Sequence, residues 1–380
     1  MKRVLFLADL NPNKLGSMEE FGLFLSEELH KRGDVCYLGF VAFPQEDLKR
    51  RFETAGAKII VFREANSLLS SLQKMISLYT FIQKAKIDIV HVNFSGLTDI
   101  DIIGVHFSTA KIIFTDHNSG VLAKRNNVKK VLLRLVHFLL FYRVSRFIAV
   151  SDFVRDRLRH SNYVKNEKCI TIYNGINLQR FNPSEKILAR NMLRFPLSCT
   201  IVCSVAMHIP EKGIHFLLQA LAILVHKNGV KDITAIIVGE GWYTDELKAM
   251  TEKLNLSNHV QYLGRRSDVQ TIIAASDMVV VPSVWEEAFG LIIAEAMASE
   301  RPVVASRIGG IPELIDHGHT GVLFEPGNID ALAQAIFVLL KNPTYRQSLA
   351  KAALAKAHER FDISQQITKL IDIYETVELS

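Results

Sequence analysis

The stretch PSVWEEAFGLIIAEAM, residues 282–297, decides the fold and locates a candidate site. It follows the apolar run Asp277–Val281, which has the composition of a buried strand. Two acids, Glu287 and Glu295, lie on either side of the Phe-Gly-Leu turn at residues 289–291. In α/β folds, phosphorylated ligands bind where a strand ends, the chain turns and a helix begins. We therefore expect acids that bind hydroxyl groups here, beside backbone amides that face a ligand.

Strands alternate with helices along the rest of the chain. The strands expected in the first half are Arg3–Ala8, Val35–Phe40, Lys58–Phe62, Ile87–Val92, Lys111–Thr115 and Arg146–Val150. Those expected in the second half are Thr200–Ala206, Thr234–Val238, Val260–Leu263, Met278–Val281, Pro302–Ala305 and Gly321–Phe324. This alternation predicts an α/β fold with two parallel sheets, each covered by helices on both faces. We expect two doubly wound domains with a cleft between the carboxyl ends of their strands.

The length of 380 residues exceeds that of one ordinary hydrophobic core and favours two domains. The segment Asn182–Ser198 has two prolines and little strand character, so it is the best candidate for a linker. We predict an N-terminal domain over residues 1–185 and a C-terminal domain over residues 186–360. A final helix over residues 361–380 is expected to pack back on the N-terminal domain.

The composition, 49% hydrophobic and 22% charged, is typical of a globular protein outside the membrane. The four cysteines form no Cys-x-x-Cys pair, which indicates a reducing, cytoplasmic setting with neither disulfides nor a zinc site. No run reaches the roughly 20 apolar residues that a membrane-spanning helix needs. The composition therefore predicts a cytoplasmic protein.

The net charge of +6 is too small to indicate nucleic-acid binding, and we expect none. The basic residues are unevenly distributed, because Leu122–Phe147 carries seven Lys and Arg side chains among apolar residues and no acid. Such a helix can lie on an anionic membrane surface, and here it would make a peripheral contact with the inner face of the membrane. The alternative, a core helix with solvated charged ends, stays open.

Glycine turns follow several of the expected strands. Gly16 lies between the first strand and the first helix, and Lys212-Gly213 occupies the matching loop of the second half. Gly239 and the pair Gly309-Gly310 follow other strands of the second half. A glycine at a helix start lets the backbone approach an anion, and a lysine there can neutralise a diphosphate. Taken singly, each of these signals also fits a structural turn or a solvated lysine.

Six segments of the second half together resemble the retaining glycosyltransferases of family 4. They are SVAMHIPEKGI (204–214), VGEGW (238–242), VQYLGRRSDV (260–269), PSVWEEAFGLIIAEAMA (282–298), RPVVASRIGGIPELI (301–315) and TGVLFEPGN (320–328). In the first half, LGSMEEFGLFLSEELHKRG (15–33), FTDHNSG (114–120), FIAVSDFVRDRL (147–158) and IYNGINLQRFNP (172–183) agree. The resemblance covers nearly the whole chain. It implies the GT-B fold, two Rossmann-like domains that face a central cleft, with acceptor bound by the first domain and nucleotide sugar by the second.

The resemblance also implies roles for individual residues. Glu287, Lys212 and His117 would be catalytic: Glu287 contacts the donor sugar, Lys212 stabilises the diphosphate, and His117 lies beside the sugar. Glu295 would accept hydrogen bonds from the ribose hydroxyls. The remaining donor-binding residues would be Gly16, Phe289, Gly290, Leu291, His208, Gly239 and Gly310.

Besides Asn177, which stands where an acid often follows Asn-Gly-Ile, three positions depart from the family pattern. Met207 stands where an arginine is usual, and the neighbouring His208 could supply the missing cation. Ser17 replaces the second glycine of the first loop, and Glu300 replaces a common glycine before the expected strand at Pro302. The first departure bears on diphosphate binding, and the others on local geometry.

We therefore expect a hexosyltransferase-type enzyme that moves a sugar, with retention, from a nucleotide-sugar donor to a glycan or lipid-linked glycan. UDP is favoured, and neither a cofactor nor a metal is expected. The spacing Asp99-Ile100-Asp101 resembles a metal motif of another fold, but it lies in a helix-like segment where solvated acids are expected. His91 lacks a partner at metal-binding spacing and is expected at a strand end or on the surface. The alternatives are a nucleotide-sugar-binding protein without transfer activity and an epimerase on the same fold.

Overall fold

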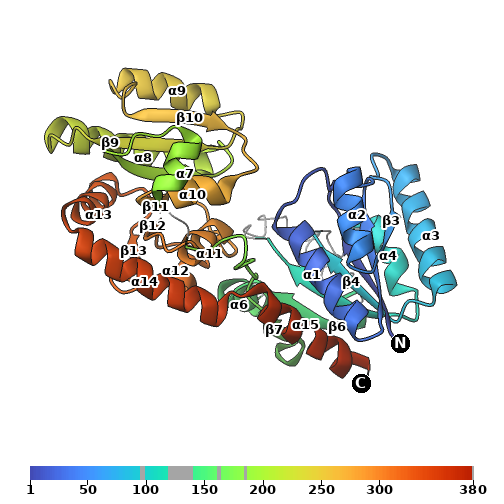
Figure 1. Ribbon diagram of the computed structural model, residues 1–380. Helices are drawn as coiled ribbons and strands as arrows, with labels where there is room; N and C mark the ends of the chain where they lie inside the picture. The colour runs from blue at the N-terminus through green and yellow to red at the C-terminus, as the bar shows by residue number, and fades with distance from the viewer. Residues whose placement is uncertain (95–98, 119–139, 161–163, 184–185, 379–380) are drawn as a thin grey trace. The chain divides into compact units, whose positions relative to one another are not determined.

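The chain divides into two compact units, each built around one parallel β-sheet (Figure 1). The structure is a computed structural model that describes residues 1–94, 99–118, 140–160, 164–183 and 186–378. Unit 1 comprises Met1–Gly175 and Ile363–Ser380, and unit 2 comprises Ile176–Asp362. Helices cover both faces of each sheet, so the predicted pair of doubly wound domains is confirmed.

The sheet of unit 1 has seven parallel strands in the order β3-β2-β1-β4-β5-β6-β7. Their bounds are Arg3–Ala8 (β1), Val35–Phe40 (β2), Ala57–Val61 (β3), Ile89–Asn93 (β4), Lys111–Asp116 (β5), Val144–Ala149 (β6) and Cys169–Thr171 (β7). The first six match the expected strands to within a few residues, because buried parallel strands are continuous apolar runs. The short edge strand β7 has no such run and was not predicted.

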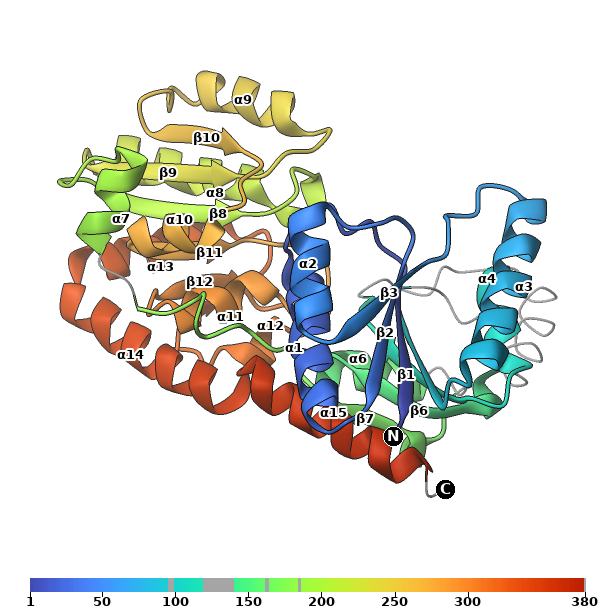
Figure 2. The same ribbon diagram turned by 45° about the vertical axis from the view of Figure 1, so that its right-hand side comes forward.

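Two helical layers cover this sheet, as Figure 2 shows for unit 1. On one face lie α1 (Ser17–Lys31), α2 (Glu46–Thr54) and the C-terminal α15 (Ile363–Glu378). On the other lie α3 (Leu68–Ala85) and α4 (Ile100–His106), while α6 (Asp152–His160) packs beside β6 and β7. Alternate residues of β1 supply both cores: Val4 and Phe6 face α1 and α15, and Leu5 and Leu7 face α3 and α4.

The sheet of unit 2 has six parallel strands in the order β10-β9-β8-β11-β12-β13. Their bounds are Thr200–Val205 (β8), Ile233–Val238 (β9), Val260–Gly264 (β10), Met278–Val281 (β11), Val303–Ser306 (β12) and Val322–Phe324 (β13). One face is covered by α8 (Ile214–Ala222), α9 (Thr244–Lys253) and α13 (Ile329–Lys341). The other helices of this unit are α7 (Lys186–Leu193), α10 (Val269–Ala275), α11 (Leu291–Ala298), α12 (Ile311–Leu314) and α14 (Pro343–Arg360).

The chain passes from unit 1 to unit 2 at Gly175–Ile176, earlier than the boundary at 185/186 expected from the sequence. The segment taken for a linker, residues 182–198, contains α7, which packs on α10. Arg190 of α7 is buried, and its guanidinium donates to the carbonyl of Ala275 at 2.9 Å. The two prolines thus lie on either side of a helix of unit 2. The chain returns from unit 2 to unit 1 at Asp362–Ile363, which places α15 in unit 1.

Both sheets reverse their strand order once, between β1 and β4 in unit 1 and between β8 and β11 in unit 2. In open α/β sheets a ligand binds outside the carboxyl ends of the strands at this reversal. Loops there diverge to opposite faces and leave a crevice between them. The candidate residues Gly16, Lys212 and Glu287 all follow one of these four strands.

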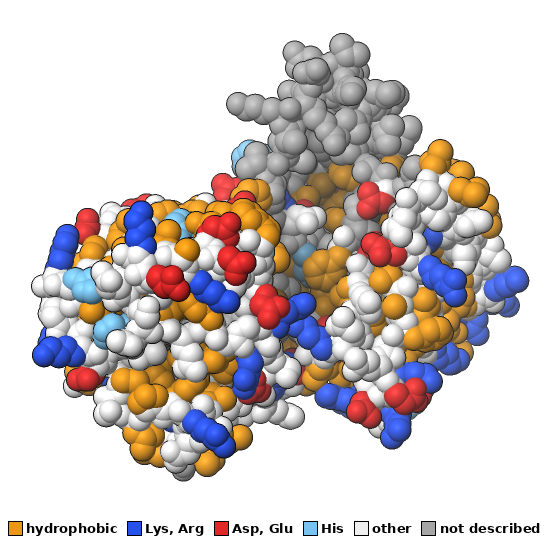
Figure 3. Space-filling model, turned by 90° about the horizontal axis from the view of Figure 1, so that it is seen from above, with side chains coloured by type: hydrophobic (Ala, Val, Ile, Leu, Met, Phe, Trp, Pro, Cys, Tyr) orange, Lys and Arg blue, Asp and Glu red, His pale blue; other side chains and the backbone are white. Residues whose placement is uncertain are grey.

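The basic segment Leu122–Phe147 was predicted to contact a membrane surface. Most of this segment, residues 122–139, lies outside the described residues. In the described part of the face shown in Figure 3, acidic and basic side chains are interspersed. The described residues therefore form no broad basic patch on that face.

Candidate functional site

Four loops at the carboxyl edge of the unit 2 sheet carry the second-half candidates. Lys212 follows β8, Gly239 follows β9, Glu287 follows β11 and Gly310 follows β12. Strands β8 and β11 are direct neighbours, although more than seventy residues separate Lys212 from Glu287. The sheet order therefore brings together two residues that the sequence places far apart.

Lys212 and Glu287 form an ion pair, with 2.6 Å between Lys212 Nζ and Glu287 Oε1. The hydroxyl of Ser283 donates to the same Oε1 at 2.7 Å. Both side chains are largely buried, which fixes their position. Within the part of the chain that the structure describes, Glu287 Oε2 accepts no hydrogen bond. The pair thus presents a cation and one uncommitted carboxylate oxygen at the same edge.

Gly213 holds the two loops together. It adopts a left-handed backbone with φ of +69°, and a Cβ atom there would overlap the carbonyl oxygen of Pro282. The amide of Val284 also donates to the carbonyl of Glu211 at 2.9 Å. Only glycine permits this close approach, so Gly213 sets the distance between the Lys212 and Glu287 loops.

The pair Gly309-Gly310 supports the backbone of Glu287. The Gly310 amide donates to the carbonyl of Glu287 at 2.8 Å. Gly309 has φ of +58°, and a Cβ atom there would lie 2.5 Å from the Glu287 carbonyl oxygen. Because its amide is already used, Gly310 acts in this structure by holding Glu287.

The turn at residues 289–291 begins α11. Gly290 has φ of +93°, and neither its amide nor that of Leu291 donates to any group among the described residues. The Phe289 side chain is buried and packs edge-to-face on Phe361, with ring centroids 5.6 Å apart. Glu295 lies one turn further along α11 and is half-buried. Open amides at a helix start are a ready position for an anion.

His208 differs from the expectation that it could supply a cation in place of the missing arginine. Its side chain is buried, its Nδ1 lies 2.9 Å from Thr244 Oγ1, and its Nε2 has no partner in the described part. Burial lowers the pKa of His208, so the imidazole is neutral at neutral pH. Gly239 packs against the end of β8 above this ring. Met207, which is exposed, has no charge, so the position of the family arginine holds no cation.

In unit 1, Gly16 precedes α1 with an extended backbone. Its amide donates to Glu19 Oε2 at 3.0 Å, and burial raises the pKa of the Glu19 carboxyl. A carboxylate of the protein's own first helical turn thus occupies the amide that was expected to face a diphosphate. A phosphate can approach this amide only if the Glu19 side chain moves.

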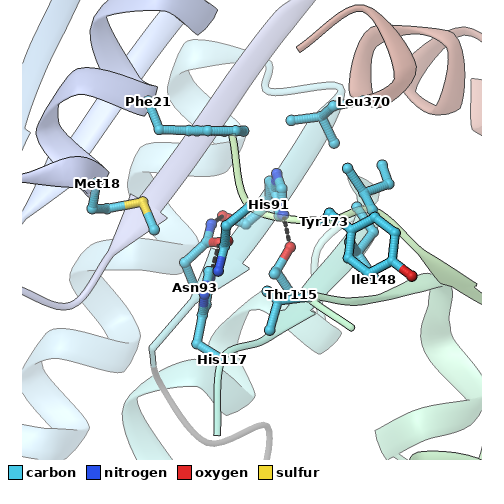
Figure 4. Close-up of a pocket in the computed structure, with 12 residues that line it drawn as sticks. Met18, Phe21, His91, Asn93, Thr115, His117, Ile148, Tyr173 and Leu370 are labelled. Atoms are coloured by element: carbon cyan, nitrogen blue, oxygen red, sulfur yellow. Dashed lines mark hydrogen bonds between the residues drawn. The ribbon is translucent and has the colours of Figure 1, made fainter. Parts of the chain in front are cut away.

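His117 follows β5 and lies beside Asn93 at the end of β4 (Figure 4). His117 Nε2 lies 3.1 Å from Asn93 Oδ1, and the ring stacks on Phe94 with centroids 4.3 Å apart. Burial lowers the pKa of His117 to about 4, so it is neutral at pH 7. Since Asn93 Oδ1 is an acceptor, Nε2 carries the proton and Nδ1 can accept a hydrogen bond from a hydroxyl.

His91 is buried in the middle of β4, so the expectation that it lies at a strand end or on the surface was wrong. Its Nδ1 lies 2.7 Å from the hydroxyl of Tyr374 on α15. Its Nε2 lies 2.6 Å from Thr115 Oγ1 (Figure 4). Burial lowers the pKa of His91 to about 3. His91, Thr115 and His117 line a cavity of about 30 Å³ together with apolar side chains such as Phe21 and Leu370.

The sequence alone did not reveal Ser283, Asn93, Thr115 and Tyr374 as partners of the candidate residues. Each is an ordinary polar residue, and its role depends on a contact made by folding. Ser283 had the best available signal, because it stands four residues before Glu287 in the same motif. Tyr374 had none, since 283 residues separate it from His91.

Two family models match the chain. Residues 19–180 match the glycosyltransferase family 4 model, and residues 186–356 match the glycosyl transferases group 1 model. Together the two matches cover most of both units. Lys212, Glu287 and Glu295 lie in the second match, and His117 lies in the first.

Curated relatives are similar over most of the chain. An Escherichia coli UDP-Gal:α-D-GlcNAc-diphosphoundecaprenol α-1,3-galactosyltransferase is 26% identical over 312 residues, which are 81% of this chain and 80% of the relative. A phosphatidyl-myo-inositol mannosyltransferase of Mycobacterium leprae is 26% identical over 372 residues, covering 96% and 94% of the two chains.

Solved structures agree with the fold. Anabaena HepE in complex with UDP-glucose has a TM-score of 0.80 and 26% identity, with 98% of this chain and 100% of that chain covered. A Rickettsia africae glycosyltransferase has a TM-score of 0.84 at 23% identity and covers 99% and 98% of the chains. The second likeness supports the fold alone.

Proposed function

Since the chain belongs to glycosyltransferase family 4, we propose that it transfers a sugar from a UDP-sugar to a lipid-linked glycan, with retention of configuration and without a metal. The chain is a glycosyltransferase of the GT-B type that binds a sugar nucleotide. The donor base, the metal independence, the stereochemistry and the acceptor are the proposed parts. The observation that carries the proposal is the Lys212–Glu287 pair beside the open amides of α11.

The pair and the amides suit the charge changes of sugar transfer. When the bond between the anomeric carbon and the phosphate oxygen breaks, negative charge develops on the diphosphate and positive charge on the sugar. The ammonium of Lys212 and the amides of Gly290 and Leu291 would stabilise the first, since preorganised donors need no rearrangement. Glu287 Oε2 would accept a hydrogen bond from a sugar hydroxyl and hold the ring in position.

Retention follows most simply from attack on the face that the phosphate leaves. The acceptor hydroxyl oxygen bonds to the anomeric carbon, and its proton passes to the departing phosphate oxygen. A double displacement needs a carboxylate nucleophile beneath the anomeric carbon. We do not assign Glu287 this role, because its Oε1 accepts hydrogen bonds from Lys212 and Ser283 and its Oε2 is assigned to a sugar hydroxyl.

The names of similar proteins support the donor and the acceptor. The E. coli relative is named for UDP-Gal and a diphosphoundecaprenol acceptor, and HepE was solved with UDP-glucose. The M. leprae relative is named for phosphatidyl-myo-inositol, a lipid. We accordingly propose a UDP-sugar as donor, bound by unit 2, and a lipid-linked glycan as acceptor, bound by unit 1.

A lipid acceptor requires that unit 1 reach a membrane surface, and α3 supports this. Leu68, Leu69, Leu72, Ile76 and Tyr79 form a stripe on α3 and are 38–68% exposed. We call these five residues the α3 stripe. No acid occurs between Glu64 and Asp88, whereas Lys84 and Lys86 are exposed. An exposed apolar face without acids suits an anionic bilayer surface. In the described part of the chain, no helix is long and apolar enough to cross a membrane.

The proposed reaction is tested by incubating the protein with UDP-sugars and GDP-sugars in EDTA. We expect UDP-sugars to raise the melting temperature and to be hydrolysed slowly at a rate that EDTA does not change. Anomeric NMR of a product formed on a lipid-linked acceptor should show retained configuration. Loss of activity in EDTA would overturn the metal independence, and an inverted product would overturn retention. A preference for GDP-sugars would overturn the assignment of UDP.

A donor that binds without hydrolysis or transfer would favour the alternative of a binding protein without transfer activity, which Met207 suggests. Release of an epimerised sugar nucleotide would favour an epimerase. Neither outcome is expected, because the Lys212–Glu287 pair and the amides of α11 are all in place.

The membrane contact is tested by changing Leu69, Leu72 and Ile76 of the α3 stripe together to Gln. Each buried apolar side chain contributes about 1.5–3 kcal/mol, so we expect co-sedimentation with phosphatidylglycerol vesicles to fall at least about tenfold. The matched control changes Ile187, Leu188 and Met192, which are equally exposed on α7 of unit 2. Equal loss in both triple variants, or none in the first, would contradict a docking role for α3.

A further inference from the structure

A second polar cavity lies at the opposite edge of the unit 2 sheet from the candidate site. Its volume is about 380 Å³, and it is lined at the amino ends of β11 and β12 by Asp277, Glu300 and Arg301. Lys186 of α7 and Arg346 and Gln347 of α14 complete its charged and polar lining. We call it the amino-edge cavity. Glu287 and Gly310 follow the same two strands at the carboxyl edge, so β11 and β12 separate the two places.

The volume and the separation indicate an independent site. Small-molecule sites typically occupy about 300–1,000 Å³, and the amino-edge cavity falls in this range. Four-residue strands that rise about 3.3 Å per residue span roughly 13 Å. A ligand in this cavity would therefore not touch Lys212 or the start of α11.

Cations outnumber acids around the amino-edge cavity. The carboxylate of Asp277 is buried and lies 2.9 Å from Lys186 Nζ, 2.6 Å from Arg190 Nη2 and 4.0 Å from Arg346 Nη2. Burial by itself would raise the pKa of Asp277. The hydrogen bonds from Lys186 and the Ile201 amide and the charge of Arg190 nevertheless hold this pKa below its ordinary value. Among the lining residues, the cations Lys186, Arg301 and Arg346 outnumber the acids Asp277 and Glu300 by one. The buried Arg190, which pairs with Asp277 but does not line the cavity, raises the excess to two positive charges.

Two of these cations have donors available to a ligand. Arg346 donates only to the carbonyl of Leu339, at 3.4 Å, among the residues described, and its 4.0 Å approach to Asp277 is too long for a hydrogen bond. Lys186 is 41% exposed and uses one of its three donors on Asp277. A tetrahedral anion placed between Lys186 and Arg346 would bind the unused donors of both.

The lining of the amino-edge cavity also offers groups that bind hydroxyls. Glu300 lies in the turn before β12 with φ of +54°, a left-handed conformation that is costly for any residue with a Cβ atom. Its carboxylate has no hydrogen-bond partner in the described part of the chain, and neither has the exposed amide of Gln347. A strained acid that faces a cavity without a hydrogen-bond partner is better explained by a ligand than by packing.

We propose that the amino-edge cavity binds a small phosphorylated polyol, of the class of sugar monophosphates. Lys186 and Arg346 hold the phosphate, and Glu300 and Gln347 bind the hydroxyls. The excess positive charge selects a doubly charged phosphate monoester over a neutral sugar, and the Glu300 carboxylate selects a hydroxylated ligand over inorganic phosphate. The inference goes beyond sugar transfer, since it concerns the other edge of the sheet.

The test is calorimetric titration of the whole protein with glucose 6-phosphate, inorganic phosphate and glucose, with and without saturating UDP. We expect glucose 6-phosphate to bind in both conditions, phosphate to bind at least tenfold more weakly, and glucose not to bind. Binding that is seen only without UDP would place the ligand at the candidate site and overturn the proposal. Absence of glucose 6-phosphate binding up to 10 mM would also overturn it, whichever donor the enzyme uses.

Two variants separate the two halves of the amino-edge cavity. Arg346→Gln should weaken both phosphate ligands at least tenfold, whereas Lys253→Gln, which removes an exposed charge from α9, should change neither. Glu300→Gly relieves the left-handed strain, so it should be no less stable than the parent chain. It should lower the preference for glucose 6-phosphate over phosphate at least fivefold. If the affinities for glucose 6-phosphate and phosphate were unchanged in both Arg346→Gln and Glu300→Gly, these two residues would not form the proposed site.

Discussion

Replacing Glu287 by Gln lowers kcat/KM for sugar transfer about 100-fold, the largest loss that we expect from a change that preserves side-chain size. The substitution removes the charge that pairs with Lys212 at 2.6 Å and the oxygen that we assign to a donor-sugar hydroxyl. Hydrogen bonds to charged groups contribute about 1.5–3 kcal/mol each, and misplacing the Lys212 ammonium adds to the loss. Steady-state kinetics with the UDP-sugar identified by the hydrolysis screen measures the effect.

The neighbouring Glu286 provides a matched control. It is half-buried in the same loop and forms no hydrogen bond in the described part of the chain. Glu286→Gln should therefore retain activity within about twofold, because its carboxylate holds no other group in position. If Glu287→Gln kept full turnover, the assignment of the sugar site would fail. Equal losses in the two variants would attribute the effect to loop charge in general.

Replacing Gly309 by Ala should impair both stability and activity. The new Cβ atom would lie 2.5 Å from the Glu287 carbonyl oxygen and 2.6 Å from its nitrogen, in a backbone with φ of +58°. We expect the free energy of unfolding to fall by about 3 kcal/mol, about half from the left-handed conformation and half from the overlap. Relief of the overlap moves Glu287, so hydrolysis of the donor should fall at least about tenfold. Urea unfolding and the EDTA-insensitive hydrolysis assay measure the two effects.

Gly229 separates the two causes, because it has a similar φ of +67° and a Cβ atom added there would have no neighbouring atom within 4 Å. Gly229→Ala should cost only about 1–2 kcal/mol from the left-handed conformation and leave hydrolysis unchanged. Activity that survives in Gly309→Ala would mean that Glu287 does not depend on this support. The comparison therefore tests the supporting role of the glycine pair without touching a residue that binds the donor.

Both predictions depend on contacts that the sequence did not reveal. The motif around Glu287 and the loop around Lys212 each indicated a ligand site, but nothing in the sequence paired the two side chains. Likewise, Gly310 was expected to face a ligand, whereas its amide supports the backbone of Glu287. His208 was a candidate cation, and only its burial in the fold makes it neutral.

Errors in the sequence prediction share one physical cause. The two prolines and the weak strand character of residues 182–198 indicated a linker, yet Arg190 docks α7 on unit 2 through carbonyls and Asp277. The edge strand β7 is three residues long and exists because β6 pairs with it. In each case a long-range contact overrides a weak local preference.

The sequence by itself determined the fold class, twelve of the strands and the residue types of the candidate site. Buried parallel strands are apolar runs and glycine turns are local, so both can be recognised without knowing which elements are neighbours. The tertiary structure alone decided the strand order, which makes β8 and β11 neighbours and so places Lys212 against Glu287. It also decided burial, which sets the charge of His117 and gathers the cations of the amino-edge cavity around Asp277. Such contacts arise between residues far apart in the chain, and local patterns carry no information about them.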